Sequence, residues 1–300
     1  MTDHPHELPD PLPARRLLFV HAHPDDEASK GAATAARYVD EGARVVLVTC
    51  TGGEAGEVLN PNYPSDIPEG ALTAIRKAEL EASIQIIGFS RAYQLGYPDS
   101  GYHEDPSGVP EGTFARTSAD VSGADLAAIL RRERPQVVVT YPEDGGYPHP
   151  DHIMTHAVTL RAVELAADPD AGVDGEPWQV AKVYANSGFP PERVLSLHEA
   201  LLARDGQSPF EGWMERAAER GQDLESDRAH CAAKLHVAPW FPRRDDALRA
   251  HATQVDPAGF WFQIDRGLEA AVFPWECFAV ISSTVDVDAP EGDLFASLDL

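Results

Sequence analysis

The sequence predicts an α/β protein built on a doubly wound, mostly parallel β-sheet. Short runs that are apolar throughout alternate with stretches of helical periodicity, and this alternation is typical of parallel strands joined by helices. The clearest runs are LLFV (17–20), RVVLVTC (44–50) and QVVVTY (136–141). A continuous apolar run is expected of a strand that helices cover on both faces. We therefore expect a Rossmann-like sheet.

The first half of the chain supplies two helices and three strands. After the strand at 17–20, residues 27–40 have a helical pattern that Gly42 closes. The strand at 44–50 is followed by a Gly-rich loop and then by a helix at 71–87, which places small and apolar side chains on one face. A weaker strand follows at 92–96.

Further along, a helix at 118–134 begins at a Ser cap, either Ser118 or Ser122. The strand at 136–141 follows, and then a helix at 151–167. The last third is less regular and forms a C-terminal helical and β elaboration from about residue 190. In this last third we expect strands at 182–187 and 277–282, and helices at 192–204, 208–220 and 244–254.

No linker or internal repeat divides the chain. Residues 1–14 contain four prolines and are expected to form a flexible tail. Residues 15–300 are expected to form a single catalytic α/β domain.

Composition excludes several function classes. The 24 Lys and Arg against 49 Asp and Glu give a net charge of −25, which opposes binding to nucleic acid or to an anionic membrane. No apolar run reaches the roughly 20 residues of a membrane span, and no signal peptide is recognisable. The three cysteines are too few for a disulfide framework. We expect a reduced, cytoplasmic protein that acts on a small molecule, with an oligomeric state that the sequence leaves open.

Two polar segments follow buried strands. His21-Ala-His-Pro-Asp-Asp-Glu27 comes directly after the first strand, and Tyr147-Pro-His-Pro-Asp-His152 follows the strand at 136–141. In a sheet of order 3-2-1-4-5 these two strands are neighbours, and the crevice at their carboxyl ends is the usual ligand site. We therefore expect both segments to face one cleft.

The side chains of these segments favour a metal site. His23, Asp26 and His152 would form a two-histidine, one-carboxylate set that leaves positions for water and substrate, as catalytic zinc sites do. We expect one Zn²⁺ per chain, with Fe²⁺ also suited to these ligands. Alone, the acidic residues 25–27 could equally be the first turn of a helix. An Fe(II) oxygenase triad is a further alternative, although such triads usually lie on all-β barrels.

The remaining side chains suggest hydrolysis of an amide. Asp25 is the candidate general base, and His149 could protonate the departing amine or stabilise the oxyanion. Tyr147 could donate to the same oxyanion, and Asp151 could orient a neighbouring imidazole. His156 is not expected to be a ligand, because HIMTH lacks the Glu of an H-E-x-x-H motif.

Together the motifs resemble the LmbE-like (PIG-L) zinc deacetylase superfamily. HAHPDDE and HPDH carry the resemblance, which runs from about residue 16 to near the C-terminus. The stretches that match are SKGAATAARYV (29–39), VTCTGGEAGEVLNP (48–61), GGYPHPDHIMTH (145–156), AHATQVDP (250–257) and WF (261–262). The resemblance implies the same roles for the metal ligands, the base and the flanking residues. Lys30 matches a lysine of the amidase branch, while Glu57, Arg76 and Asp99 match positions that contact sugar or inositol hydroxyls.

Within the superfamily, the sequence is similar to the branch that hydrolyses mycothiol S-conjugates. That activity yields a mercapturic acid (an S-substituted N-acetylcysteine) and glucosaminyl-inositol, in thiol-based detoxification. The nearest alternative is deacetylation of N-acetylglucosaminyl-inositol in mycothiol biosynthesis. A deacylase of antibiotic pathways is a second alternative.

Overall fold

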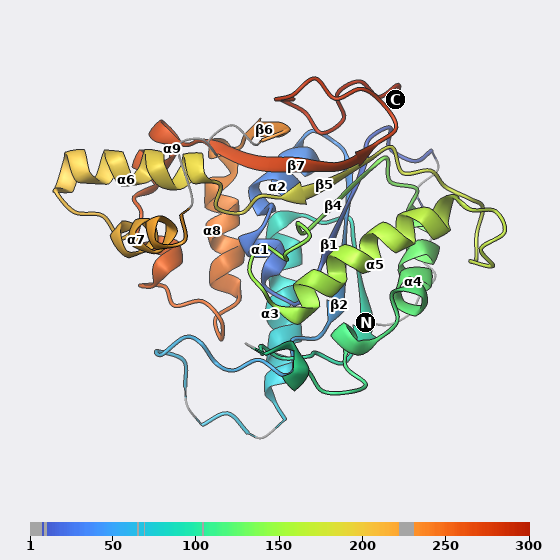
Figure 1. Ribbon diagram of the computed structural model, residues 1–300, viewed down its shortest axis with the longest axis horizontal. Coiled ribbons are helices and arrows are strands. Elements are labelled where there is room, and N and C mark those ends of the chain that lie inside the picture. Colours follow the sequence, from blue (N-terminus) through green and yellow to red (C-terminus); the bar gives the residue numbers. More distant parts are fainter. Residues whose placement is uncertain (1–7, 9–10, 65, 69, 104, 222–230) are drawn as a thin grey trace.

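The computed structural model describes residues 8 and 11–300, except residues 65, 69, 104 and 222–230. Within these residues one sheet has the strand order β3-β2-β1-β4-β5-β7-β6 (Figure 1). Its strands are β1 (Arg16–His21), β2 (Arg44–Thr51), β3 (Arg91–Tyr97), β4 (Val137–Thr140), β5 (Lys182–Asn186), β6 (Ala233–His236) and β7 (Trp275–Ser283). Strands β1 to β5 are parallel, whereas β7 runs antiparallel to β5 and β6. The predicted α/β fold with a mostly parallel sheet is confirmed.

Helices cover both faces of the sheet. They are α1 (Asp26–Ser29), α2 (Ala32–Asp40), α3 (Leu72–Ile87), α4 (Ala119–Glu133), α5 (Pro150–Ala167), α6 (Pro191–Asp205), α7 (Glu211–Glu219), α8 (Phe241–Ala250) and α9 (Arg266–Val272). Alternate side chains of β1 enter separate cores, because successive residues of a strand point to opposite faces. Leu17 and Phe19 belong to the apolar core on the face that α1, α2, α3 and α8 cover. Leu18 and Val20 belong to the core on the opposite face, which α4 and α5 cover. Each face of the sheet therefore has its own apolar layer.

The predicted helix at 27–40 is wrong as a single element, since the chain breaks between α1 and α2. Gly31 separates them with a φ of 92°, a left-handed conformation that other residues rarely adopt. A Cβ at this position would lie 2.8 Å from Cε1 of Phe19. The break lets the backbone approach β1 closely and turns the short α1 toward the end of that strand.

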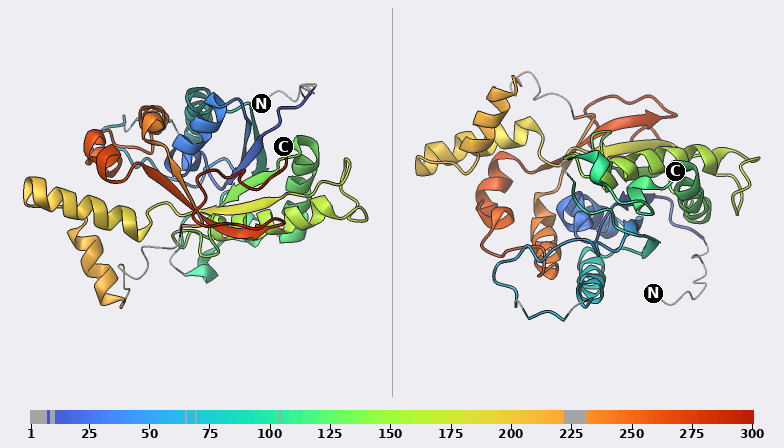
Figure 2. Two further views of the ribbon diagram at one scale, coloured as in Figure 1. Left: turned by 90° about the horizontal axis from the view of Figure 1, so that it is seen from above. Right: turned by 60° about the horizontal axis from the view of Figure 1, so that its bottom comes forward.

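The C-terminal elaboration differs in detail from the prediction. Helix α8 starts earlier and ends earlier than the predicted 244–254, because Pro242 suits a first helical turn and His251 leaves the helical conformation. The short β6 and the helix α9 were not predicted. Helices α6 and α7 extend beyond the edge of the sheet (Figure 2), and they pack on α9 through a separate small apolar cluster. The predicted cap at Ser118 is confirmed, because its Oγ accepts from the N–H of Asp120.

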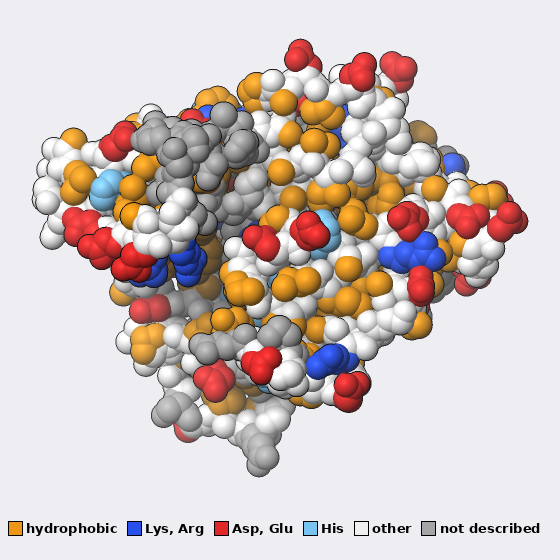
Figure 3. Space-filling model, in the orientation of Figure 1, with side chains coloured by type: hydrophobic (Ala, Val, Ile, Leu, Met, Phe, Trp, Pro, Cys, Tyr) orange, Lys and Arg blue, Asp and Glu red, His pale blue; other side chains and the backbone are white. Residues whose placement is uncertain are grey.

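Residues 1–7 and 9–10 of the predicted tail lie outside the described residues. No helix within the described part of the chain is both long and apolar enough to cross a membrane; a cytoplasmic location stays a prediction. On the face drawn in Figure 3, acidic side chains are spread in small groups and the few Lys and Arg side chains lie near them.

Candidate metal centre and active site

The two polar segments meet at the carboxyl ends of β1 and β4. These strands pair directly, with Leu17 opposite Val137, so the loops that follow them lie at the same edge of the sheet. His23, Asp26 and His152 are buried there, and their ligand atoms all lie within 4.8 Å of one another. The structure thus brings together the three residues that the sequence predicts as metal ligands.

The donor atoms of this group fit a divalent metal ion. Oδ2 of Asp26 lies 3.4 Å from Nδ1 of His23 and 3.4 Å from Nε2 of His152. The opposite ring nitrogens are already engaged, His23 Nε2 with Asp151 at 3.1 Å and His152 Nδ1 with the Gly145 carbonyl at 3.1 Å. A ring nitrogen that donates to such an acceptor fixes the tautomer and leaves the other nitrogen with a free lone pair. Nδ1 of His23, Oδ2 of Asp26 and Nε2 of His152 face one another and are therefore all available to a cation.

Backbone geometry sets the position of His152. The Gly145 carbonyl that accepts from this ring belongs to a residue with a φ of 77°, and a Cβ there would lie 2.8 Å from Cβ of His152. The ring of Tyr141 stacks on the imidazole at a centroid distance of 4.2 Å. His152 is thereby held between a glycine turn and an aromatic ring.

The carboxylate of Asp151 lies 3.1 Å from Nε2 of His23, which belongs to the other segment; that it orients this imidazole stays a prediction. Its Oδ2 also accepts from the N–H of Ser100 at 3.0 Å, whereas its buried Oδ1 has no hydrogen-bond partner among the described residues. His149 caps α5, with its Nδ1 accepting from the Asp151 N–H. Burial and the nearby His23 and His152 lower the pKa of His149 to about 4. The ring is therefore neutral near pH 7 and carries its proton on Nε2.

Each of the three consecutive carboxylates has its own cationic partner. Asp25 Oδ2 lies 3.1 Å from Arg76, and Asp26 Oδ1 accepts from Nζ of Lys30 at 2.7 Å. Glu27 contacts the buried His251 at 2.6 Å. These pairings explain how three adjacent acidic side chains are tolerated in a mostly buried turn.

Asp25 is held in an uncommon backbone conformation. Its φ of 107° lies in the left-handed region, which costs a non-glycine residue of the order of 1–3 kcal/mol. Its N–H donates to Oε2 of Glu27 at 2.9 Å, and Arg76 donates to the carbonyl of Pro24 at 2.7 Å. The strained turn is therefore supported from two sides. Its carboxylate lines a neighbouring cavity.

That cavity has a volume of about 480 Å³ and a polar wall, and we call it the polar cavity. Predicted residues that line it are His23, Asp25, Glu57, Arg76, Asp99, Tyr147 and His149. Glu57 is exposed, while the guanidinium of Arg76 is already bound to Gly53, Pro24 and Asp25. Asp99 accepts from the N–H groups of Ala55 and Gly101. The structure brings these side chains to one cavity; their contact with substrate stays a prediction.

Two more predicted residues, Lys30 and Tyr147, lie beside the candidate ligands. Lys30 is tied to Asp26 rather than free, and it does not line the polar cavity. The hydroxyl of Tyr147 lies 3.5 Å from Nε2 of His152. This side chain is 46% exposed, so it faces open space at the edge of the candidate metal site.

Sequence reasoning missed several residues that support the site. Tyr141 ends the predicted strand at 136–141, and Ser100 lies four residues after the predicted strand at 92–96, so their position beside the site could have been anticipated. His251 could not, because it follows a helix 224 residues away from Glu27 in the sequence. His156, which was not expected to be a ligand, contacts the carbonyl of Tyr141 through its Nδ1.

The fold and the site define a class: an α/β enzyme with a centre that can hold a divalent metal ion at the switch point of its sheet. The chain matches the family described as PIG-L, GlcNAc-PI de-N-acetylase, over residues 18–163. It is 45% identical to a mycothiol S-conjugate amidase of Streptomyces coelicolor over 94% of this chain and 97% of that protein. It is 41% identical to a 1D-myo-inositol 2-acetamido-2-deoxy-alpha-D-glucopyranoside deacetylase of Streptomyces griseus, over 96% and 90% of the two chains.

Solved structures share the fold at lower identity. An N,N'-diacetylchitobiose deacetylase from Pyrococcus horikoshii matches with a TM-score of 0.59 and 20% identity, over 89% of this chain and 84% of that one. A 4-carboxy-2-hydroxymuconate hydratase from Pseudomonas putida also has a TM-score of 0.59, with 16% identity over 91% and 98% of the chains. The fold therefore does not by itself decide the reaction.

The identity to full-length relatives shows that the chain belongs to the PIG-L family. It is a hydrolase that acts on amide bonds. The amidase and deacetylase relatives differ little in identity to this chain, so the particular amide is a separate question.

Proposed function

We propose that this enzyme hydrolyses the amide of mycothiol S-conjugates, releasing a mercapturic acid and glucosaminyl-inositol. The observation that carries the proposal is the His-Asp-His group at the switch point of a chain that is 45% identical to an amidase of this type. Lys30 adds support. It matches the lysine of the amidase branch, and its Nζ is bound directly to the candidate ligand Asp26. The segment AHATQVDP (250–257) gives further support, because its His251 contacts Glu27 in the turn that carries Asp25 and Asp26.

We also propose that His23, Asp26 and His152 hold one zinc ion, with Fe²⁺ as the other ion suited to this donor set. A metal ion bound here would polarise the scissile carbonyl and make water a stronger nucleophile. Asp151 holds His23 in the ligating tautomer, and Lys30 holds the second oxygen of Asp26. The chain therefore presents its ligands in fixed orientations.

The remaining residues have separate tasks in the proposed reaction. Asp25 takes a proton from the attacking water, since its carboxylate lines the polar cavity without being part of the ligand group. The protonated Asp25 can then return this proton to the departing amine. Neutral His149 donates from Nε2 to the carbonyl oxygen as negative charge develops, and the Tyr147 hydroxyl assists. Glu57, Arg76 and Asp99 position the hydroxyl-rich amine part of the substrate.

Deacetylation of N-acetylglucosaminyl-inositol is the second candidate, favoured by the 41% identity to a deacetylase. We expect a bimane-labelled mycothiol conjugate to be hydrolysed with a kcat/KM at least tenfold higher than that for the acetylated sugar. The measurement is release of glucosaminyl-inositol from both substrates in parallel. Efficient turnover of the acetylated sugar with an intact conjugate would assign the chain to the deacetylase instead.

A second prediction concerns the metal. Asp151→Asn is expected to weaken metal binding by roughly 10- to 100-fold, because the neutral amide holds the His23 proton less strongly. Competition with a chromogenic chelator measures the affinity, and metal analysis of the untreated protein should give about one ion per chain. Asp144→Asn, which changes an exposed carboxylate in the same loop, is the matched control. Unchanged affinity in Asp151→Asn would show that this carboxylate does not support the ligand.

A further inference from the structure

A second, apolar cavity lies beside the candidate metal site. Its volume is about 600 Å³, within the range of small-molecule pockets, and we call it the apolar cavity. Aromatic side chains dominate its outer wall: Phe189, Phe210, Trp213, Phe260 and Trp261. The rings of Phe189, Phe260 and Trp261 form one cluster with centroid distances of 5.4–5.8 Å. Phe260 is nevertheless 50% exposed, so this aromatic surface is open to a ligand.

The inner end of the apolar cavity reaches the reacting centre. Lys30, Tyr141 and Tyr147 line that end, and all three contact or approach the candidate metal ligands. Tyr147 lines the polar cavity as well. The His-Asp-His group therefore lies where the two cavities meet, with a polar space on one side and an aromatic space on the other.

This arrangement assigns a different part of an amide substrate to each cavity. The polar cavity suits an amine carrying many hydroxyls, because carboxylates such as Glu57 and Asp99 accept hydrogen bonds. The apolar cavity is roughly twenty times the ~30 Å³ that one water molecule occupies in the liquid. An acetyl group, whose methyl is about that size, would leave most of it unfilled. The space fits an acyl part with a large apolar substituent.

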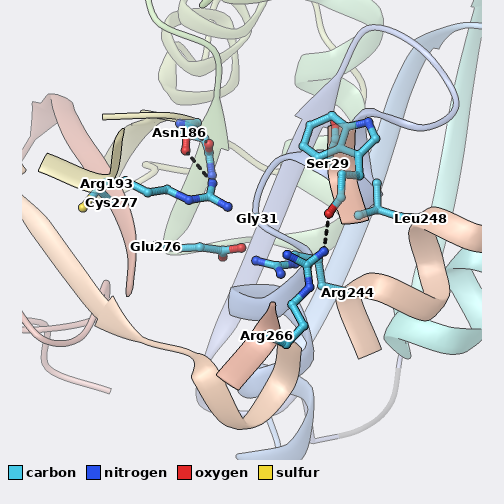
Figure 4. Close-up of a pocket in the computed structure, with 11 residues that line it drawn as sticks. Ser29, Gly31, Asn186, Arg193, Arg244, Leu248, Arg266, Glu276 and Cys277 are labelled. Atoms are coloured by element: carbon cyan, nitrogen blue, oxygen red, sulfur yellow. Dashed lines mark hydrogen bonds between the residues drawn. The ribbon is translucent and has the colours of Figure 1, made fainter. Parts of the chain in front are cut away.

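Two half-buried arginines, Arg193 and Arg266, hold the aromatic wall in place. The side chains of Arg193 and Arg266 line one small pocket (Figure 4), which Trp261 of this wall lines as well. The Arg193 guanidinium lies 4.3 Å from the ring centroid of Phe189, and Arg266 donates to the carbonyl of Trp261. Both arginines bond to the buried Glu269. The wall is thus preformed, which reduces the entropy that a ligand must remove on binding.

We propose that the apolar cavity is the acyl-side subsite, and that it receives an aromatic or long aliphatic substituent on the sulfur of the substrate. The enzyme then selects conjugates of large apolar groups over conjugates of small ones and over acetamides. This inference rests on the proposed function, because it assumes that an amide is cleaved between the two cavities.

The first test compares amides that share the glucosaminyl-inositol amine and differ in the acyl part. We expect kcat/KM for S-benzyl-N-acetylcysteine as acyl group to exceed that for the S-methyl analogue by at least tenfold. Phe260→Ala should reduce this ratio at least threefold. Tyr102→Ala removes an exposed aromatic side chain of the polar cavity and should change all substrates by the same factor. A benzyl-to-methyl ratio that Phe260→Ala does not alter would overturn the proposal.

The second test requires no turnover. Titration with S-benzyl-N-acetylcysteine, followed by tryptophan fluorescence, should reach half-saturation at a concentration at least tenfold lower than with the S-methyl acid. Trp213→Phe should diminish the fluorescence change, while Phe260→Ala should weaken binding. Tight binding of the benzyl acid by an enzyme that cleaves none of the amides would overturn the proposed function and support the subsite. Equal affinity for the S-benzyl and the S-methyl acid would overturn the proposed subsite, whether or not the enzyme cleaves the amides.

Discussion

Asp25→Asn is expected to retain the metal ion and to lose roughly 10²- to 10⁴-fold in kcat, the usual contribution of a general base. The amide preserves the shape of the side chain and can still accept from Arg76, but it has no proton affinity with which to activate water. Burial and the adjacent Asp26 carboxylate raise the pKa of Asp25, although Arg76 opposes them. A raised pKa makes this carboxylate a stronger base.

The variant is suited to the test because asparagine tolerates the left-handed conformation that Asp25 adopts. We expect unchanged metal content and an unchanged midpoint of thermal unfolding beside the lost turnover. Asp105→Asn, in an exposed part of the chain, provides a carboxylate-to-amide control that should behave as the wild type. Loss of metal from Asp25→Asn would make Asp25 a ligand instead of the base.

The position of the candidate metal site could be predicted because it depends on the order of the strands. Apolar runs locate β1 and β4, and a doubly wound sheet places the residues after them at one edge. His23 and His152 are 129 positions apart in the numbering and still meet for this reason. Local sequence, combined with one topological rule, was sufficient to predict that these candidate ligands lie together.

The partners of the acidic turn could be predicted only in part. Lys30 lies four residues after Asp26, a spacing that favours contact within a helical turn. Arg76 reaches Asp25 from α3, and His251 reaches Glu27 from the end of α8, so both contacts depend on how helices pack. No periodicity in the sequence encodes those distances.

The apolar cavity was also beyond sequence reasoning. The apolar cavity is assembled from loops after β4 and β5, from α7 and from the segment at 260–261, which are far apart in the chain. Single aromatic residues in such segments have no pattern that distinguishes a ligand pocket from an ordinary core. The break at Gly31 was missed for a related reason, since its cause is the approach to Phe19 in another element.

Glu269→Gln is expected to lower the free energy of unfolding by about 3 kcal/mol, because it leaves the buried Arg244 and the half-buried Arg193 and Arg266 without their shared counter-ion. Glu269 is 1% exposed and accepts from Arg193, Arg244 and Arg266 at distances between 2.7 and 3.1 Å. Asp245 also accepts from two of these arginines, and the charge of Glu276 acts on Arg193 and Arg244, but Glu269 is the carboxylate that all three arginines share. Urea unfolding at pH 7 measures the loss.

The contribution of Glu269 to the stability of the folded protein also depends on pH, in a direction that can be stated. Burial would raise the pKa of Glu269, but the surrounding arginines lower it to about 2 from the usual 4.5. The folded state therefore holds fewer protons than the unfolded state between these values, and stability falls as the pH decreases from 4.5 toward 2. A carboxyl group with this difference contributes about 3 kcal/mol at neutral pH.

Glu269→Gln should remove this part of the acid dependence as well as the stability at pH 7. Glu164→Gln, which alters an exposed ion pair with Arg161, should change the free energy of unfolding by less than about 0.5 kcal/mol. Because Arg193 and Arg266 also hold Phe189 and Trp261, the loss of Glu269 should loosen the aromatic wall before the protein unfolds globally. A variant that kept wild-type stability at pH 7 and the same decline toward pH 2 would show that Asp245 and solvent neutralise the arginines without Glu269.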